Sequence, residues 1–196
     1  MIMAHNYFKK FLLLHLKIDE SKIDAILKKS RHSIVHKDDF LLRANAHCKH
    51  TFFVEKGLLR QFSTDDKGKE HIISFAPEGW LVTDRESVFF NEPSAYNIQA
   101  LEDSQVVIID DELLQRIAQK APNFVRFNSR LLHNHIRHLQ QRINLLLSAT
   151  AEERYLKFVS MYPNILQRVP QSMIASYLGI TPESLSRVRR ELTNKT

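Results

Sequence analysis

Hydrophobic residues near the start of the chain recur at helical spacing. The residues that carry this spacing are Phe8, Phe11, Leu12, Leu16, Ile23, Ile26 and Leu27. Because apolar residues three or four positions apart share one face of a helix, residues 3–30 are predicted to be helical. Asp19 lies in a break between the two halves of this pattern and is expected to cap the second half.

From residue 33 to residue 110 the pattern changes to short β-rich runs separated by turns. The runs expected to be strands are 33–36, 40–42, 51–54, 58–63, 71–75, 95–100 and 105–109. The turn from Asp65 to Gly68 is the clearest hairpin tip, because glycine adopts the positive φ that a tight turn needs. Many short strands at this spacing predict a β-sandwich or a barrel.

Residues 111–194 are again predicted to be helical. A short helix is expected over 111–120, followed by a long helix from Pro122 to Ser148. Such a helix would be about 40 Å long at 1.5 Å per residue. Thr150 and Glu153 form a capping box that begins the next helix, which is expected to end near Pro163.

The long helix carries an apolar seam with a spacing of three and four residues. The seam consists of Val125, Leu132, Ile136, Leu139, Ile143 and Leu146. A seam of this kind is typical of a helix that pairs with a second helix, so it indicates a homodimer. Packing of the seam on the chain's own β domain is the alternative. Further apolar residues on the helix favour one face for the β domain and another for a second subunit; they are Phe124, Phe127, Leu131, Leu145 and Leu147.

The same helix is basic. No acidic residue occurs between Leu113 and Ala151, and most of the arginines in this stretch are expected to lie on a solvated helix face. His135 and His138 are spaced to share one face, but no carboxylate lies nearby in the sequence. We therefore predict no metal site on this helix.

The segment from Pro170 to Leu192 carries the strongest functional pattern. Ala175 is small, as two closely crossing helices require, and Gly179 permits a left-handed turn residue. Thr181 can cap a second helix with Pro182 at its first position. Together these residues predict a helix-turn-helix, although a small helical hairpin with a charged outer face would show some of the same features.

A helix-turn-helix places the N-terminal side chains of its second helix against base edges in the major groove of DNA. Arg187 can donate two hydrogen bonds to guanine, and Glu183 can accept one from cytosine. The residues expected to read bases are Glu183, Ser186 and Arg187. The residues expected to contact the DNA backbone are Gln171, Ser172, Thr181, Arg189 and Arg190.

Composition is compatible with this interpretation. The 196 residues include 28 Lys and Arg against 22 Asp and Glu, a net charge of 28 − 22 = +6 that permits a polyanionic partner without establishing one. The sequence contains no predicted membrane segment, because no apolar run approaches the roughly 18 residues of a membrane span. The first residues lack the charged region of a signal peptide, so a cytoplasmic location with no membrane contact is expected. Cys48 is the only cysteine, which excludes an intramolecular disulfide.

The order of a β-rich domain, a long helix and a helix-turn-helix resembles the Crp/Fnr family of bacterial transcription regulators over nearly the whole chain. The segments that carry the resemblance are 52–60, 66–73, 75–80 and 174–192. It implies an α+β chain with three parts. They are a cyclic-nucleotide-binding-type jelly roll, or double-stranded β-helix, over 1–121, a dimerisation helix over 122–148 and a helix-turn-helix domain over 149–196 with little or no wing. The implied partners are double-stranded DNA and RNA polymerase.

The DNA-reading residues match one branch of this family. The Fnr branch has a Glu-x-x-Ser-Arg pattern, which corresponds here to Glu183, Ser186 and Arg187. The resemblance therefore implies an inverted repeat with TTGA-like half-sites. The cyclic-AMP branch has an additional arginine before that glutamate, where this chain has Pro182.

The effector cassette departs from the family. Thr83 and Asp84 stand where a Gly-Glu pair holds the ribose, and Ser94 stands where an arginine holds the phosphate. Arg85 could replace that arginine only if its loop turned it inward. Cyclic AMP is therefore not the expected effector, because its phosphate would lose a charge-assisted partner. The expected effector pocket consists of Thr83, Asp84, Arg85, Ser94 and Ala95. An unknown small molecule, or constitutive DNA binding, remains open.

Two alternative interpretations place a metal site or a haem in the β domain. His47, His50 and Glu55 are a near miss for the first metal motif of a cupin barrel, possibly an enzyme, but Val82 occupies the histidine position of the second motif. Cys48 and its neighbouring histidines could ligate haem iron. The N-terminal cysteines of the oxygen-sensing branch are absent, which excludes its iron–sulfur cluster. No cofactor and no enzymatic activity are predicted.

Overall fold

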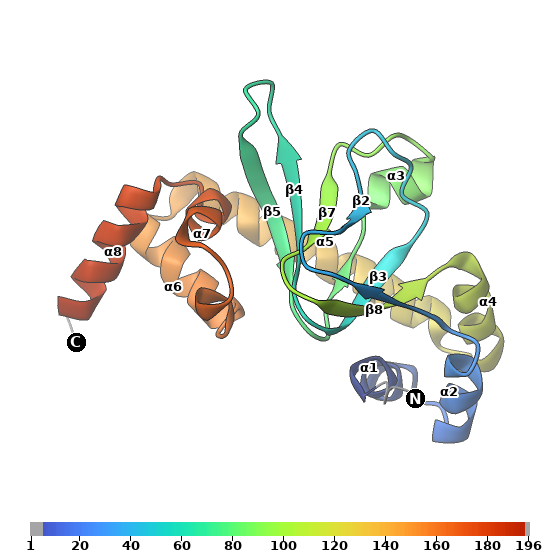
Figure 1. Cartoon of the computed structure of the whole chain (residues 1–196). Coiled ribbons are helices and arrows are strands. Elements are labelled where there is room, and N and C mark those ends of the chain that lie inside the picture. Colours follow the sequence, from blue (N-terminus) through green and yellow to red (C-terminus); the bar gives the residue numbers. More distant parts are fainter. Residues whose placement is uncertain (1–5, 195–196) are drawn as a thin grey trace.

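The computed structural model describes residues 6–194. A β domain with short helices beside it occupies one side of the molecule, and a long helix runs behind it toward a group of helices at the far end (Figure 1). The described chain begins beside the β domain and ends in the helical group, so its two ends lie far apart (Figure 1). The mixed α and β fold class expected from the sequence is confirmed.

The first two helices are α1 (Asn6–Leu16) and α2 (Glu20–Leu27). The backbone N–H groups of Tyr7 and Phe8 donate to the Glu55 carboxylate at 3.1 and 3.0 Å, so the β domain satisfies free donors at the start of α1. Asp19 is the N-cap residue of α2, as predicted, although its side chain makes no capping hydrogen bond. Residues 3–5 of the predicted helix lie outside the described residues.

The β domain consists of two four-stranded antiparallel sheets, with strand orders β1-β8-β3-β6 and β2-β7-β4-β5. The strands are β1 (Arg31–Val35), β2 (Phe40–Leu42), β3 (Thr51–Lys56), β4 (Leu59–Thr64), β5 (Glu70–Ala76), β6 (Leu81–Val82), β7 (Asn97–Ala100) and β8 (Ser104–Ile109). Most neighbours within a sheet come from distant parts of the sequence, as in the expected jelly roll. The sequence patterns missed β6 and the short helix α3 (Arg85–Phe90).

Buried side chains from both sheets form the core of this domain. Val54, Leu59, Ile98 and Val106 have almost no exposed surface, and they belong to strands of different sheets. Side chains alternate between the two faces of a strand, so each strand contributes one face to this core. The domain is therefore held by apolar burial between its sheets, with no disulfide.

Tight turns fix the ends of the strands. Gly68 has φ of 78° and its N–H donates to the Asp65 carbonyl at 2.9 Å, which confirms the predicted hairpin tip. Gly57 has φ of 97°, and a Cβ atom there would lie 2.7 Å from the Cα atom of Ser104. Only glycine fits this turn between β3 and β4.

The remaining helices are α4 (Asp111–Lys120), α5 (Phe124–Ser148), α6 (Ala151–Met161), α7 (Gln171–Leu178) and α8 (Pro182–Asn194), with a 3₁₀ turn at Ile165–Gln167. Thr150 and Glu153 form the predicted capping box at the start of α6. The long helix begins at Phe124 and not at Pro122, because Pro122 and Asn123 form a turn. No helix within residues 6–194 has the length and hydropathy needed to cross a membrane.

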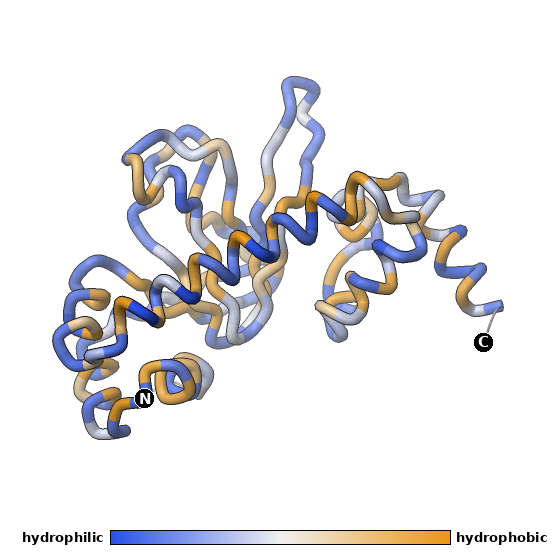
Figure 2. Tube along the Cα trace, turned by 180° about the vertical axis from the view of Figure 1, so that it is seen from behind, coloured by the Kyte–Doolittle hydropathy of each residue, from blue (hydrophilic) through white to orange (hydrophobic). Residues whose placement is uncertain are grey.

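The long helix α5 connects the β domain to the terminal helices. Seen from behind, it crosses the molecule with apolar and hydrophilic positions alternating along its length (Figure 2). Phe127 is buried against the N-terminal helices, and Phe124 and Leu131 are partly buried in the same cluster. One face of α5 thus packs on its own chain as predicted, except that Leu147 of the predicted apolar surface is 82% exposed.

Candidate DNA-binding helix and effector cassette

The helices α7 and α8 form the predicted helix-turn-helix. Gly179 has φ of 67° and ends α7 in the left-handed conformation. Thr181 accepts a hydrogen bond from the Ser184 backbone N–H at 3.2 Å, and Pro182 is the first residue of α8. Ala175 is buried where the two helices meet. Each of these features was expected from the sequence, because each depends on neighbouring residues only.

The base-reading candidates lie on the outer face of α8. Glu183, Ser186 and Arg187 are exposed, and Leu185 and Val188 on the opposite side are buried. At about 100° per residue, Arg190 falls on the same outer face as Glu183. Glu183, Ser186, Arg187 and Arg190 therefore form one polar row along α8, which we call the α8 row.

The charges of the α8 row are available for a partner. No salt bridge to Arg187 or Arg190 is present within residues 6–194. The N–H of Glu183 and the hydroxyl of Thr181 lower the pKa of the Glu183 carboxyl, which keeps it ionised as an acceptor. Among the backbone-contact candidates, Gln171 and Ser172 are exposed at the start of α7, whereas Arg189 is half-buried on the flank of α8.

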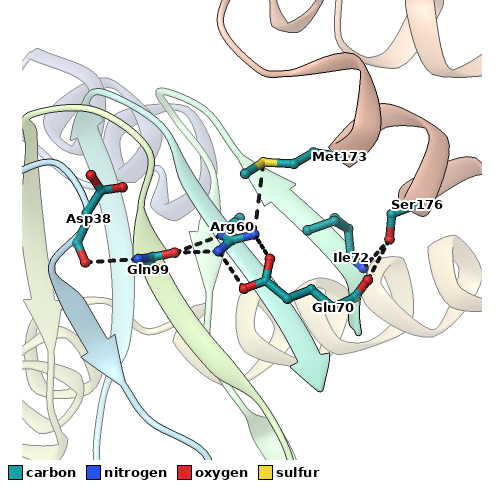
Figure 3. Close-up of polar contacts among 7 residues, drawn as sticks. All are labelled: Asp38, Arg60, Glu70, Ile72, Gln99, Met173 and Ser176. Atoms are coloured by element: carbon teal, nitrogen blue, oxygen red, sulfur yellow. Dashed lines mark hydrogen bonds and ion pairs between the residues drawn. The ribbon is translucent and has the colours of Figure 1, made fainter. Parts of the chain in front are cut away.

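The first helix of the helix-turn-helix docks on strand β5. Ser176 in α7 accepts a hydrogen bond from the Ile72 N–H at 3.0 Å and donates one to the Glu70 carbonyl at 3.2 Å (Figure 3). Arg142 of α5 donates to the Ile72 carbonyl at 3.2 Å and stacks on the Tyr177 ring, 3.8 Å from its centroid. These contacts fix the orientation of α7 relative to the β domain.

A buried arginine lies beneath this contact. Arg60 is 5% exposed, and its guanidinium donates to Gln99 and pairs with the Glu70 carboxylate (Figure 3). The Gln99 side chain in turn donates to the Asp38 carbonyl at 2.9 Å. The Met173 sulfur of α7 lies 4.0 Å from Arg60. A charged network inside the β domain thus extends to the helix-turn-helix.

A second interdomain contact joins three charged side chains. Arg168 follows the 3₁₀ turn, and both of its terminal nitrogens lie 3.0 Å from oxygens of Glu78. It also donates to Glu102 at 2.6 Å. Sequence analysis missed Arg168, Arg142 and Ser176, because their partners in the β domain are more than 60 residues away in the sequence and leave no local pattern. Arg142 is one of the basic residues of α5, most of which were expected on a solvated face.

Two residues of the expected effector cassette, Asp84 and Ser94, are hydrogen-bonded to each other. Asp84 is buried; its carboxylate accepts hydrogen bonds from the backbone of α3 and one from the Ser94 hydroxyl at 2.6 Å. The Thr83 hydroxyl donates to the His50 carbonyl at 3.1 Å, and Ala95 is exposed. Arg85 lines a groove beside His135 of α5. The structure brings Asp84 and Ser94 together, whereas Arg85 lines the groove beside α5.

The histidines near Cys48 form no ligand cluster. Cys48 is buried and its thiol donates to the His50 carbonyl at 3.3 Å. Within the part of the chain that the structure describes, no three side chains of His, Cys, Asp or Glu are grouped to hold a metal ion. The three ligands that the cupin alternative needs are therefore not brought together among the described residues.

The predicted seam of α5 is open to solvent in the single chain. Ile136 and Leu139 are each 44% exposed, and Ile143 is 56% exposed. Val125, Leu132 and Leu146 complete the row and are also exposed. Repeated apolar side chains along one exposed helix face are typical of a surface that another helix covers.

Comparison with known proteins identifies the family. The cyclic nucleotide-binding domain matches residues 34–121. The transcriptional activator protein anr of Pseudomonas aeruginosa is 32% identical over 181 residues, which are 87% of this chain and 72% of that protein. The fumarate and nitrate reduction regulatory protein of Vibrio cholerae is 28% identical over 90% of this chain and 75% of its own length.

Solved structures agree with the fold. FixK2 from Bradyrhizobium japonicum superposes with a TM-score of 0.72 at 19% identity and covers 85% of each chain. The β domain, the long helix and the terminal helices thus follow a known arrangement. The FixK2 structure shows the fold, and the 32% identity to the anr protein establishes that the chain belongs to the Crp/Fnr family of transcriptional regulators.

Proposed function

We propose that this chain acts as a homodimer that binds an inverted repeat with TTGA-like half-sites. The observation that carries this proposal is the α8 row, in which Glu183, Ser186 and Arg187 are exposed together and Arg187 forms no salt bridge with another described residue. An arginine can donate two hydrogen bonds to one guanine, and a carboxylate can accept from cytosine. The residues of the α8 row suit this chemistry.

Dimerisation supplies the second reading helix. The exposed seam of α5 is the surface that we assign to the partner, because burying its apolar side chains favours association. Two α8 helices would then enter successive major grooves about 34 Å apart on one face of the duplex. We assign the phosphate contacts to Gln171, Ser172, Thr181, Arg189 and Arg190. Contact with RNA polymerase and a cytoplasmic location remain predictions.

The proposed regulation does not use cyclic AMP. Asp84 is occupied by the α3 backbone and by Ser94, and Ser94 itself cannot pair with a phosphate as an arginine would. We therefore propose that the cassette residues Thr83, Asp84, Arg85, Ser94 and Ala95 do not hold the phosphate of cyclic AMP.

Selection of DNA from a random pool tests the proposed specificity. Ligand-free protein is used at about 0.15 M salt, where non-specific binding is weak. Enrichment of an inverted repeat with TTGA-like arms is expected from the full chain, and the Arg187→Ala variant should lose the preference at one position of each arm. Recovery of single, unpaired half-sites would contradict the dimer, and recovery of no motif by a folded protein would contradict ligand-free sequence recognition.

A further inference from the structure

Arg60 of β4 is a buried cation, and most of its N–H groups donate to oxygen atoms. Its guanidinium stacks on the Phe62 ring, 4.0 Å from the ring centroid. Its Nε and Nη2 atoms donate to the Gln99 side-chain oxygen at 2.9 and 2.7 Å. The Glu70 carboxylate accepts from Nη2 at 3.0 Å and also from Nη1. A guanidinium has five N–H donors, so four of them have oxygen acceptors here.

The fifth N–H of Arg60 donates to sulfur. Its acceptor is the thioether of Met173 in α7, whose sulfur lies 4.0 Å from Nη1 (Figure 3). A thioether sulfur is only a weak acceptor, and a buried donor without a strong acceptor costs free energy. Arg60 thus retains the capacity to bind one more oxygen atom at the place where the Met173 side chain ends.

Met173 lies where small oxidants can reach it. It belongs to the first turn of α7, it is half-buried, and the two residues before it, Gln171 and Ser172, are exposed. Met161 is also half-buried, but it packs against an apolar cluster that includes Phe158. Oxidation would therefore place a polar oxygen among apolar side chains at Met161, whereas at Met173 it would place that oxygen beside a cation.

We propose that Met173 is a site of oxidation by peroxides, and that its sulfoxide oxygen accepts a hydrogen bond from the buried Arg60. A lone pair of the sulfur attacks one oxygen of hydrogen peroxide, so that an S–O bond forms and the O–O bond breaks. The proton of the attacked oxygen passes to the departing hydroxide, which leaves as water. The sulfur loses two electrons and the peroxide gains them. The product is a polar sulfoxide, and its bond to the guanidinium is charge-assisted.

The new hydrogen bond would tighten the docking of α7 on the β domain. Ser176 already binds backbone groups of β5, and it lies three residues after Met173, so both side chains are on one face of α7. A bond from Met173 to Arg60 would hold this face at a second point. A sulfoxide in an apolar core is disruptive, so stabilisation at this position depends on the arginine.

Hydrogen exchange at the Ile72 N–H measures this docking, because its acceptor is the Ser176 hydroxyl of α7. The full chain, free of DNA, is treated with hydrogen peroxide, and peptide mass spectrometry quantifies the sulfoxide at Met173 and at Met161. Oxidation at Met173 should slow the exchange at Ile72 by at least about fivefold, the effect of one added hydrogen bond. Unchanged or faster exchange in protein oxidised at Met173 would overturn the proposal. So would a Met173 that stays unoxidised where Met161 reacts.

Two variants of Met173 separate the oxygen acceptor from other effects of peroxide. Met173→Leu removes the sulfur with little change of volume and keeps Met161 and Cys48, so peroxide should leave its exchange at Ile72 unchanged. Met173→Gln carries an amide oxygen and, without peroxide, should exchange more slowly at Ile72 than Met173→Leu. An equal response of the wild type and Met173→Leu to peroxide would assign the effect to another residue. Equal exchange in the two variants would contradict the bond to Arg60.

Oxidation at Met173 stands on the contact with Arg60 alone, whereas its use in regulation rests on the proposed function. DNA selection without peroxide tests recognition by α8, and hydrogen exchange without DNA tests the oxidation site, so the failure of one leaves the result of the other intact. If both succeed, peroxide should change the affinity for the selected repeat in the wild type and not in Met173→Leu, because a modification that stabilises one arrangement of α7 shifts the population toward it.

Discussion

The Ser94 hydroxyl donates a 2.6 Å hydrogen bond to the Asp84 carboxylate, and both side chains are buried. The same carboxylate accepts from the backbone N–H groups of Glu86 and Ser87 at the start of α3. Asp84 is therefore a helix cap held in place by Ser94. The segment in which the family resemblance placed the effector pocket thus forms hydrogen bonds that stabilise the β domain.

Loss of the Ser94 hydroxyl should destabilise the protein. Ser94→Ala leaves the buried Asp84 carboxylate with one donor fewer, which is expected to lower the free energy of unfolding by about 1–3 kcal/mol. Urea denaturation measures this change. Ser148→Ala, at an exposed serine near the end of α5, should change the free energy by less than about 0.5 kcal/mol. Equal effects of the two substitutions would contradict the role of Ser94.

Acid should loosen the contact between Arg168 and Glu78. Burial raises the pKa of the Glu78 carboxyl, but hydrogen bonds from Arg168 and from the Gly57 N–H outweigh this effect and hold the pKa below its usual range. Because the folded-state pKa is depressed, the stabilisation is present above about pH 4.5 and is lost as pH falls through the lower folded value.

Arg168→Gln measures that contact. The substitution should lower the free energy of unfolding by about 1–3 kcal/mol at pH 7, since charge-assisted hydrogen bonds to two carboxylates are lost. The difference from the wild type should shrink as the pH falls below about 4.5, because the Glu78 carboxylate that binds Arg168 then becomes protonated. Urea denaturation over this range gives both values. A difference that stays constant with pH would mean that Arg168 acts through packing alone.

Ser176 should protect the backbone of β5 from exchange with solvent. Ser176→Ala removes the acceptor of the Ile72 N–H and should accelerate hydrogen exchange at Ile72 about fivefold, which corresponds to one ordinary hydrogen bond of about 1 kcal/mol. Ser172→Ala changes an exposed serine of the same helix and should leave this rate unchanged. An unaltered Ile72 rate in Ser176→Ala would show that α7 does not shield this edge.

Two arginines of the α8 row, Arg187 and Arg190, should contribute differently to DNA affinity and to sequence specificity. Arg187→Ala is expected to cost about 1–3 kcal/mol per half-site and to relax specificity there. Arg190→Ala should weaken binding to all sequences similarly. It should also reduce the steepness with which the logarithm of the DNA affinity falls against the logarithm of the salt concentration, by about 1 for each lost phosphate contact. Binding isotherms at several salt concentrations distinguish the two. An unchanged slope for Arg190→Ala would remove this residue from the phosphate contacts.

A charge in the seam should separate the subunits. Ile136→Glu places a carboxylate among the exposed apolar side chains of α5 and should convert the proposed dimer to monomers in sedimentation experiments. Asn144→Glu adds the same charge to an exposed position of α5 outside the seam and should remain dimeric. A monomeric wild type would refute the dimer itself.

Local patterns predicted most elements because their causes are local. The capping box at Thr150 and the left-handed Gly179 depend on a few neighbouring residues, and both were confirmed. The two-residue strand β6 and the helix α3 were too short to produce a clear period. The orientation of Arg85 and the contact of Ser176 with β5 depend on how distant segments pack, so composition and spacing gave no signal for them.

The docking of α7 on β5 has a consequence for aggregation. β5 is an outer strand of its sheet, and Ser176 and Arg142 bind backbone groups at Glu70 and Ile72 that would otherwise be unpaired. An open strand edge can pair with the edge of another molecule. Any movement that lifted the helix-turn-helix away from β5 would therefore expose a surface suited to intermolecular sheet formation.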